Sequence, residues 1–276
     1  MNTLNIIGAG HVGRALGRLF ATRGVCALQD VLTRSPASAR AAVDFIGAGC
    51  AVGDVSALRP ASLWMVAVSD DRIADVAQQL AASCNLRGAV VFHCSGARSS
   101  SELDAVRSAG ALVASVHPVR SFADPQQVAE AFDGTFCGVE GDAGALALLD
   151  PALAAIGARV VHIDARAKTV YHAASVFASN YLVTVLDAAL RAYQAAGIPA
   201  EVARELARPL ATETLANVFR LGPETALSGP IARGDAATVS RQQAAVQAWD
   251  PPSGALYDAL AVATWDLARR KHAHKS

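Results

Sequence analysis

The stretch Leu4-Asn5-Ile6-Ile7-Gly8-Ala9-Gly10-His11-Val12-Gly13 decides the fold of this chain. Its first four residues predict a strand, and the helical pattern of residues 11–23 follows the glycines directly. In a G-x-G-x-x-G loop between strand and helix, the first glycine makes the tight turn and the second lets the backbone approach a pyrophosphate, while the third allows close helix packing. We therefore expect Gly8, Gly10, His11, Val12 and Gly13 to hold a dinucleotide. The alternative is a glycine-rich turn without a ligand.

The end of the next expected strand indicates which dinucleotide is bound. An NAD site has Asp or Glu about 20 residues after the glycines, to bind the ribose 2′-hydroxyl. This chain has Thr33-Arg34-Ser35 there, and Asp30 lies earlier in the strand. Arg34 can bind a 2′-phosphate bidentately, with Thr33 and Ser35 as hydroxyl donors. The pattern favours NADP; Arg34 as an ordinary surface charge is the alternative.

Short apolar runs alternate with amphipathic stretches over the first 164 residues, which predicts an α/β domain with a mostly parallel sheet. The expected strands are 4–7, 26–33, 63–68, 89–93, 112–117, 135–139 and 159–162, and the expected helices are 11–23, 36–46, 72–84, 100–109, 125–132 and 143–156. Residues 165–276 predict an all-helical domain instead. Its expected helices are 170–196, 200–219, 238–248 and 253–270.

Composition excludes several classes of protein. Of the 276 residues, 53% are hydrophobic and the formal net charge is zero, which indicates a globular chain without a basic surface for nucleic acid. The five cysteines show no paired spacing, which argues against a disulfide framework or a metal site. We read no apolar run long enough for a bilayer and no signal peptide, so we expect a cytoplasmic protein without membrane contact.

Polar residues follow several expected strands, where ligands sit in open α/β sheets. Val68 and Ser69 end one strand and are expected to contact the cofactor. Ser95 follows another, and His117 ends a third. A strand-end histidine can act as acid or base near neutral pH, or it can be a hydrogen-bonded structural residue.

One face of the expected long helix carries a polar stripe. Lys168, His172, Ser175 and Ser179 are spaced by 4, 3 and 4 residues, and Asn180 lies at the edge of the same face. Lys168 is the only lysine before residue 271, and lysine can transfer a proton where arginine cannot. Lys168, His172 and Asn180 are candidate catalytic residues, the first two as acid–base groups, and Ser175 is a candidate substrate contact. A surface position for Lys168 is the alternative.

A glycine-rich turn further on contains Arg233, which could bind a substrate carboxylate bidentately. It could equally be a plain helix–helix connection with Asp235 as the N-cap.

These motifs together resemble one family, the Rossmann-like proteins that carry the helical C-terminal domain of unknown function 2520. The residues that carry the resemblance are the glycine loop with Thr33-Arg34-Ser35, Ser95-Gly96, His117-Pro118, Tyr171-His172-Ala173-Ala174, Asn180-Tyr181-Leu182, Gly229-Pro230 and Arg233-Gly234-Asp235. The resemblance implies an NADP-dependent oxidoreductase with no settled substrate.

More distant resemblances suggest roles for single residues. The Ser95 and His117 strand ends look like prephenate dehydrogenase, which implies that His117 handles the substrate proton and Ser95 helps to position it. Lys168 and His172 are similar to the Lys-x-x-x-Asn pair of β-hydroxyacid dehydrogenases, with His in place of Asn. Residues 195–198 and the helices after them look like pyrroline-5-carboxylate reductase, whose helical domain dimerises by intertwining.

The sequence therefore predicts an enzyme that transfers a hydride between NADP(H) and a small substrate that bears a carboxylate. Since the helical half is apolar on more than one face, we also expect a homodimer. The alternative function is an NADP-binding sensor without turnover, because fold alone does not fix function.

Overall fold

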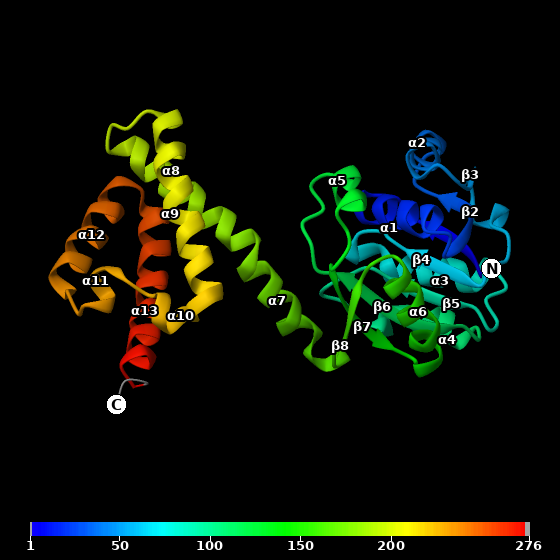
Figure 1. The fold of residues 1–276 in the computed structure, drawn as a ribbon. Helices are drawn as coiled ribbons and strands as arrows, with labels where there is room; N and C mark the ends of the chain where they lie inside the picture. The colour runs from blue at the N-terminus through cyan, green and yellow to red at the C-terminus, as the bar shows by residue number, and fades with distance from the viewer. Residues whose placement is uncertain (1, 274–276) are drawn as a thin grey trace. The chain divides into compact units, whose positions relative to one another are not determined.

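The computed structural model describes residues 2–273 and shows one eight-stranded sheet in the order β3-β2-β1-β4-β5-β6-β7-β8 (Figure 1). The strands from β1 to β6 are parallel, β7 runs antiparallel to β6, and β8 is parallel to β7. The strands are β1 (Asn2–Ile7), β2 (Cys26–Leu32), β3 (Cys50–Val52), β4 (Leu63–Val66), β5 (Val90–His93), β6 (Leu112–Pro118), β7 (Phe136–Gly141) and β8 (Arg159–His162).

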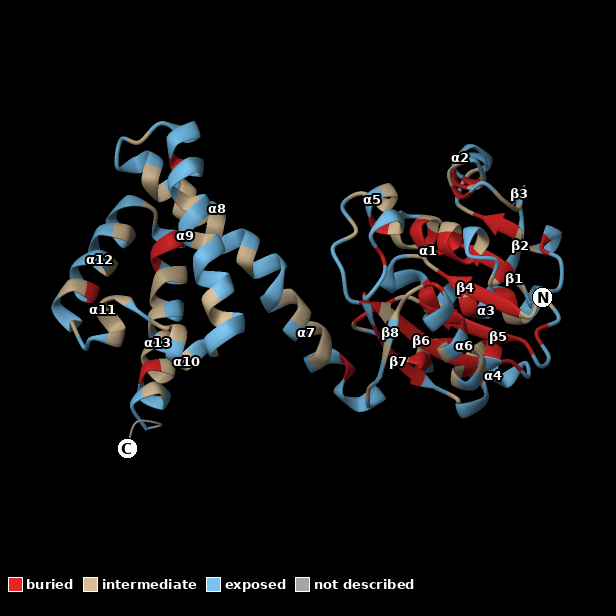
Figure 2. Cartoon of the chain, viewed as in Figure 1, coloured by how far each residue is buried: buried red, intermediate tan, exposed pale blue. Residues whose placement is uncertain are grey.

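Helices connect these strands. They are α1 (His11–Thr22), α2 (Pro36–Ile46), η1 (Val55–Ala57), η2 (Asp70–Arg72), α3 (Ile73–Ser83), η3 (Ser100–Leu103), α4 (Asp104–Ser108), α5 (Pro125–Glu130), α6 (Ala143–Ala155) and η4 (Ala165–Ala167). Because β-strand side chains alternate, the central strands contribute apolar side chains to two clusters, and buried residues concentrate along these strands (Figure 2). Ile6 and Met65 pack with α1 and α6 in one cluster, while Trp64 and Val66 pack with α3 in the other. The sheet is therefore covered by helices on both faces.

The predicted fold class is confirmed: a Rossmann-like parallel sheet precedes a helical region. Each predicted strand is present with ends shifted by a few residues at most. The three-residue β3 was missed because so short a run carries no periodicity.

The chain divides into two compact units, residues 1–179 and 180–276. The helices after η4 are α7 (Lys168–Ala178), α8 (Asn180–Ala195), α9 (Ala200–Leu221), α10 (Pro223–Ala226), α11 (Gly229–Ala232), α12 (Ala236–Trp249) and α13 (Pro251–Ala273). The expected single helix over 170–196 is interrupted at Ser179, whose ψ of −74° departs from helical geometry. Residues 165–179, which the sequence placed in the helical domain, belong with the first unit, because Lys168 is buried against the sheet.

One helical stretch, Ala165–Ala195, has the length and mean hydropathy, 1.4, to cross a membrane by those two criteria alone. From the sequence we expected no apolar run long enough for a bilayer, and this stretch departs from that expectation. A soluble protein's helix can pass the same test, so this stretch does not by itself indicate a membrane protein.

Candidate functional site

The carboxyl ends of four neighbouring strands carry the candidate site. Since β1, β4, β5 and β6 are parallel neighbours, their carboxyl ends lie along the same edge of the sheet. The glycine loop follows β1, Val68-Ser69 follows β4, and Ser95-Gly96 follows β5. His117 is the next-to-last residue of β6. The fold thus brings together residues that the sequence separates by up to about a hundred positions.

The glycine loop has the backbone that dinucleotide binding needs. Gly8 has φ +83° and rests against the end of β4, where a Cβ would lie 2.6 Å from the Ala67 carbonyl oxygen. A Cβ on Gly13 would lie 2.7 Å from the Gly8 carbonyl oxygen, so both positions require glycine. Gly10 faces open space and caps α1 without any side-chain hydrogen bond, which leaves the first amides of the helix available for an anion.

His11 links this loop to the segment after His117. Its Nδ1 lies 2.5 Å from the carbonyl oxygen of Phe122. The loop and the segment after β6 therefore meet over the amino end of α1.

The end of β2 presents Arg34 to solvent at the start of α2. Thr33 donates to the Ser35 carbonyl, and Ser35 accepts from the Ser38 amide as N-cap of α2, so both hydroxyls already have partners within the chain. Asp30 is 1% exposed and is bound by Arg59, whose Nη2 lies 2.6 Å from its Oδ1. The Asp30 carboxylate is thus already paired with Arg59, which leaves Arg34 as the charged group at the end of β2.

His93 and Ser95 build a tight turn after β5. The Ser95 amide donates to His93 Nδ1 at 3.1 Å, and His93 Nε2 donates to the Ser99 carbonyl at 3.0 Å. The Ser95 hydroxyl accepts from the amides of Ala97 and Arg98. Ser95 therefore shapes the turn. The neighbouring Cys94 is a poor nucleophile, because burial raises the pKa of its thiol to about 12.

Acid should destabilise this turn. Burial lowers the pKa of His93 from 6.5 to about 4, so between these values the unfolded chain binds a proton that the folded chain does not. The free energy of unfolding should therefore fall as the pH drops from 6.5 towards 4, by a few kcal/mol on the order expected for such a shift. Urea unfolding at about pH 7.5 and about pH 5 measures this effect.

His93→Gln removes the titrating group and should flatten the acid dependence, whereas His162→Gln, at an exposed position, should leave it unchanged. His117 adds to the same trend, because its pKa is also lowered to about 4. Identical pH dependence in wild type and His93→Gln would refute the assignment.

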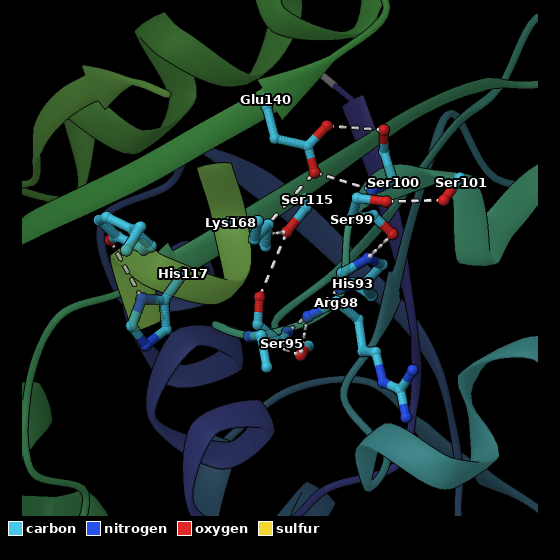
Figure 3. A network of polar contacts seen from close by, with 12 residues as sticks. His93, Ser95, Arg98, Ser99, Ser100, Ser101, Ser115, His117, Glu140 and Lys168 are labelled. Atoms are coloured by element: carbon cyan, nitrogen blue, oxygen red, sulfur yellow. Dashed lines mark hydrogen bonds and ion pairs between the residues drawn. The ribbon is translucent and has the colours of Figure 1, made fainter. Parts of the chain in front are cut away.

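A buried polar network lies behind this turn (Figure 3). Lys168 is 1% exposed; its Nζ donates to the Ser115 hydroxyl and lies 3.9 Å from Glu140 Oε1. Glu140 accepts from the Ser100 amide at 2.7 Å and from its hydroxyl at 2.8 Å. Ser115 in turn donates to the Ser95 carbonyl at 3.3 Å. Through these bonds the first turn of α7 is tied to the sheet and to the loop after β5.

Two histidines converge beside Gly96. The His117 and His172 ring centroids are 5.4 Å apart at 74°. A Cβ on Gly96 would lie 2.3 Å from His172 Nδ1 and 2.7 Å from His117 Nε2, so both nitrogens lie close against Gly96. His172 Nδ1 is buried and has no hydrogen-bond partner within residues 2–273. Because buried polar atoms are normally paired, this nitrogen indicates a place for a ligand atom.

Burial, together with smaller effects of the neighbouring His172 and Lys168, lowers the pKa of His117 to about 4, against a weaker effect of Asp70. His117 is therefore a neutral imidazole at neutral pH. Burial also lowers the pKa of Lys168, to about 8, although Glu140 opposes this.

The structure groups some of the sequence-predicted residues and separates others. His117, Lys168, His172 and Ser95 come together within the first unit. Ser175 lies further along α7 and is half-buried, while Asn180 and Arg233 are exposed residues of the second unit. Their catalytic and substrate-binding roles stay predictions. Asp235 caps α12 by accepting from the Thr238 amide, as the simpler interpretation of that turn predicted.

Sequence reasoning missed three members of the site: Ser115, Glu140 and Tyr171. Ser115 and Glu140 lie in strands, where a polar residue between apolar neighbours looks like the usual alternation of buried and exposed side chains. A glycine inside a strand often marks a close approach, so Gly138 was the available signal for Tyr171, whose hydroxyl would be 2.3 Å from a Cβ there.

Comparison with known proteins agrees with this architecture. Residues 2–118 match the Rossmann-like domain, and residues 135–264 match the domain of unknown function DUF2520. Both matches agree with the resemblance that the motifs carry. No curated protein matches the sequence significantly.

Several solved structures share the fold. A Bacteroides fragilis protein described as an NADP oxidoreductase is 22% identical, with TM-score 0.79 over 96% of this chain and 98% of its own. A Thermotoga maritima protein is 28% identical, with TM-score 0.75 over 98% and 99%. A reductive aminase of Aspergillus terreus, solved with NADPH and ethyl-5-oxohexanoate, is 17% identical, with TM-score 0.67 over 99% and 94%. Prephenate dehydrogenase and pyrroline-5-carboxylate reductase are also among the similar folds.

Proposed function

We propose that this chain is an NADP-dependent oxidoreductase in which His117 carries the proton that accompanies hydride transfer. One observation carries the proposal: His117 Nε2 and His172 Nδ1 both lie against Gly96, on the sheet edge that also bears the glycine loop. A binding module has no need for two convergent imidazoles at that place. The similar folds solved with NADPH or described as NADP oxidoreductases support the same reading.

The residues at the sheet edge fit a dinucleotide. The uncapped amides of α1 would hold the pyrophosphate, Gly8 and Gly13 shape the loop, and Arg34 would bind the 2′-phosphate. The bound nicotinamide would supply or accept the hydride. Within the chain, His117 moves the proton, and a polar substrate atom within hydrogen-bond distance of His117 Nε2 and His172 Nδ1 would give both nitrogens a partner.

Lys168 is the weaker of the two candidates for the proton. Its ammonium group is enclosed and hydrogen-bonded to Ser115. We therefore assign Lys168 to holding α7 in place and His117 to the chemistry.

NADPH should bind more tightly than NADH. A bidentate contact between Arg34 and the 2′-phosphate should contribute on the order of 1.5–3 kcal/mol, or about tenfold to a hundredfold in affinity. Fluorescence titration with each cofactor measures the ratio of the two dissociation constants. Arg34→Ala should abolish the preference for NADPH, with little change in the affinity for NADH. The matched control is Arg40→Ala, an exposed arginine within α2. Equal affinities of the wild type for the two cofactors would rule out this role.

Turnover distinguishes an enzyme from a sensor. Small keto acids, cyclic imines and keto esters form the first panel, with consumption of NADPH as the signal. An enzyme consumes NADPH with at least one class of carbonyl or imine compound. If NADPH binds but no member of a broad panel is reduced, the sensor becomes the better reading.

We further propose that the second unit forms a homodimer. Among residues 180–273 the buried apolar side chains are only Ala203, Val239 and Ala268, which is too little for a stable core. Large apolar side chains are exposed instead, including Phe219 at 86%, Val262 at 72% and Val183 at 67%. A second copy offers the same apolar helices, so two units can cover each other symmetrically.

Light scattering at micromolar concentration should therefore give twice the mass of one chain. Phe219→Asp should shift the protein towards single chains, while Glu213→Asp on the same helix should not. A wild-type protein that remains a single chain and binds lipid vesicles would instead assign the apolar helices to a membrane.

A further inference from the structure

Tyr171 contacts the proposed proton carrier, His117, at its Nδ1 side. Its hydroxyl lies 3.1 Å from His117 Nδ1, the ring nitrogen that does not face Gly96. The two rings meet edge-on, with centroids 5.5 Å apart and planes at 87°. Tyr171 precedes His172 on α7, so one helical turn supplies both neighbours of the His117 imidazole.

The sheet fixes the position of the Tyr171 hydroxyl. Gly138 of β7 is paired with His117 of β6 in the antiparallel register. The phenol oxygen rests on Gly138 so closely that any larger residue would collide with it. Burial raises the pKa of Tyr171, and a hydrogen bond from the Gly138 backbone opposes this only in part. The phenol therefore keeps its proton at neutral pH.

These contacts determine where the protons lie. Because the phenol keeps its proton and its oxygen lies 3.1 Å from His117 Nδ1, the hydroxyl can donate and Nδ1 can accept. A neutral imidazole whose Nδ1 accepts a hydrogen bond must carry its proton on Nε2. Nε2 is the nitrogen that lies against Gly96, close to His172 Nδ1.

We propose that Tyr171 holds His117 in the tautomer protonated at Nε2 and supplies the proton that replaces the one His117 gives away. This inference rests on the proposed function and adds the direction of the reaction. An Nε2 that carries a proton can give it to a substrate, which is what reduction of the substrate requires. As the Nε2–H bond breaks and the substrate gains the proton, the Tyr171 proton moves to Nδ1. The imidazole stays neutral, the phenolate remains on Gly138, and water returns the proton to it afterwards.

Nitrogen NMR of the full-length protein tests the tautomer without any substrate. The His117 signals are identified by their loss in His117→Asn. In the wild type, Nε2 should show the shift of a protonated nitrogen and Nδ1 that of an acceptor. In Tyr171→Phe the population should move towards the Nδ1-protonated form, while Tyr193→Phe, on α8, should match the wild type.

Turnover provides the second readout. Tyr171→Phe should lower kcat about 10²–10⁴-fold, as expected for the loss of a proton-transfer group, with the Kd of NADPH unchanged. A wild-type His117 protonated at Nδ1, or a tautomer that is the same in Tyr171→Phe, would overturn the inference. If no substrate is ever reduced, the proposed function fails on its own, and the NMR result still decides the role of Tyr171.

Discussion

His117→Asn should lose about 10²–10⁴ in turnover while NADPH binds with unchanged affinity. Asparagine keeps a polar side chain of similar reach but cannot exchange a proton near neutral pH. The glycine loop and Arg34 lie on other segments, so the Kd of NADPH should not move. Steady-state kinetics with a substrate from the panel and fluorescence titration of NADPH measure the two quantities side by side.

The matched control is His162→Asn, an exposed histidine of the same unit that pairs with Asp150. It should keep full turnover. Unchanged turnover in His117→Asn would remove the acid–base assignment, and lost NADPH binding would assign His117 to the cofactor or to folding instead.

Lys168→Met should cost about 3–5 kcal/mol of folding free energy, because it leaves the Glu140 carboxylate buried without a countercharge. The side chain that replaces lysine has similar length, so the effect arises from charge and hydrogen bonding. Urea unfolding gives the free energy directly.

Two comparison variants make this result specific. Arg166→Met breaks an exposed ion pair with Asp164 two residues earlier and should cost at most about 1 kcal/mol. Adding Glu140→Gln to Lys168→Met should recover much of the loss, since the unpaired charge is then removed. A Lys168→Met protein as stable as the Arg166→Met protein would mean that Lys168 is not buried with Glu140 in solution.

The parts of the fold that follow local patterns could be predicted from the sequence. The glycine loop, the strand–helix alternation and the change to helices after residue 164 all appear at their expected places. The i,i+4 spacing correctly put Lys168 and His172 on one face of a helix. The spacing could not show that this face packs on the sheet, which buries the lysine.

The parts that depend on pairing between distant segments could not be predicted. Glu140 meets Lys168 only because β7 turns antiparallel beside β6, and no local pattern reveals that reversal. Ser95 was expected to position a substrate, yet its hydroxyl closes its own turn. Tyr171 looked like one apolar residue of a helix until the structure placed it on Gly138 and His117.

Transfer of deuterium from the C4 position of NADPH tests the central claim most directly. The protein is incubated with NADPH deuterated on one face or the other, together with a substrate from the panel, and the product is analysed by mass spectrometry. The account predicts deuterium in the product from one face only, at a rate that His117→Asn lowers about 10²–10⁴-fold. Bound NADPH that transfers no deuterium to any compound of the panel would contradict the claim that this chain is an oxidoreductase.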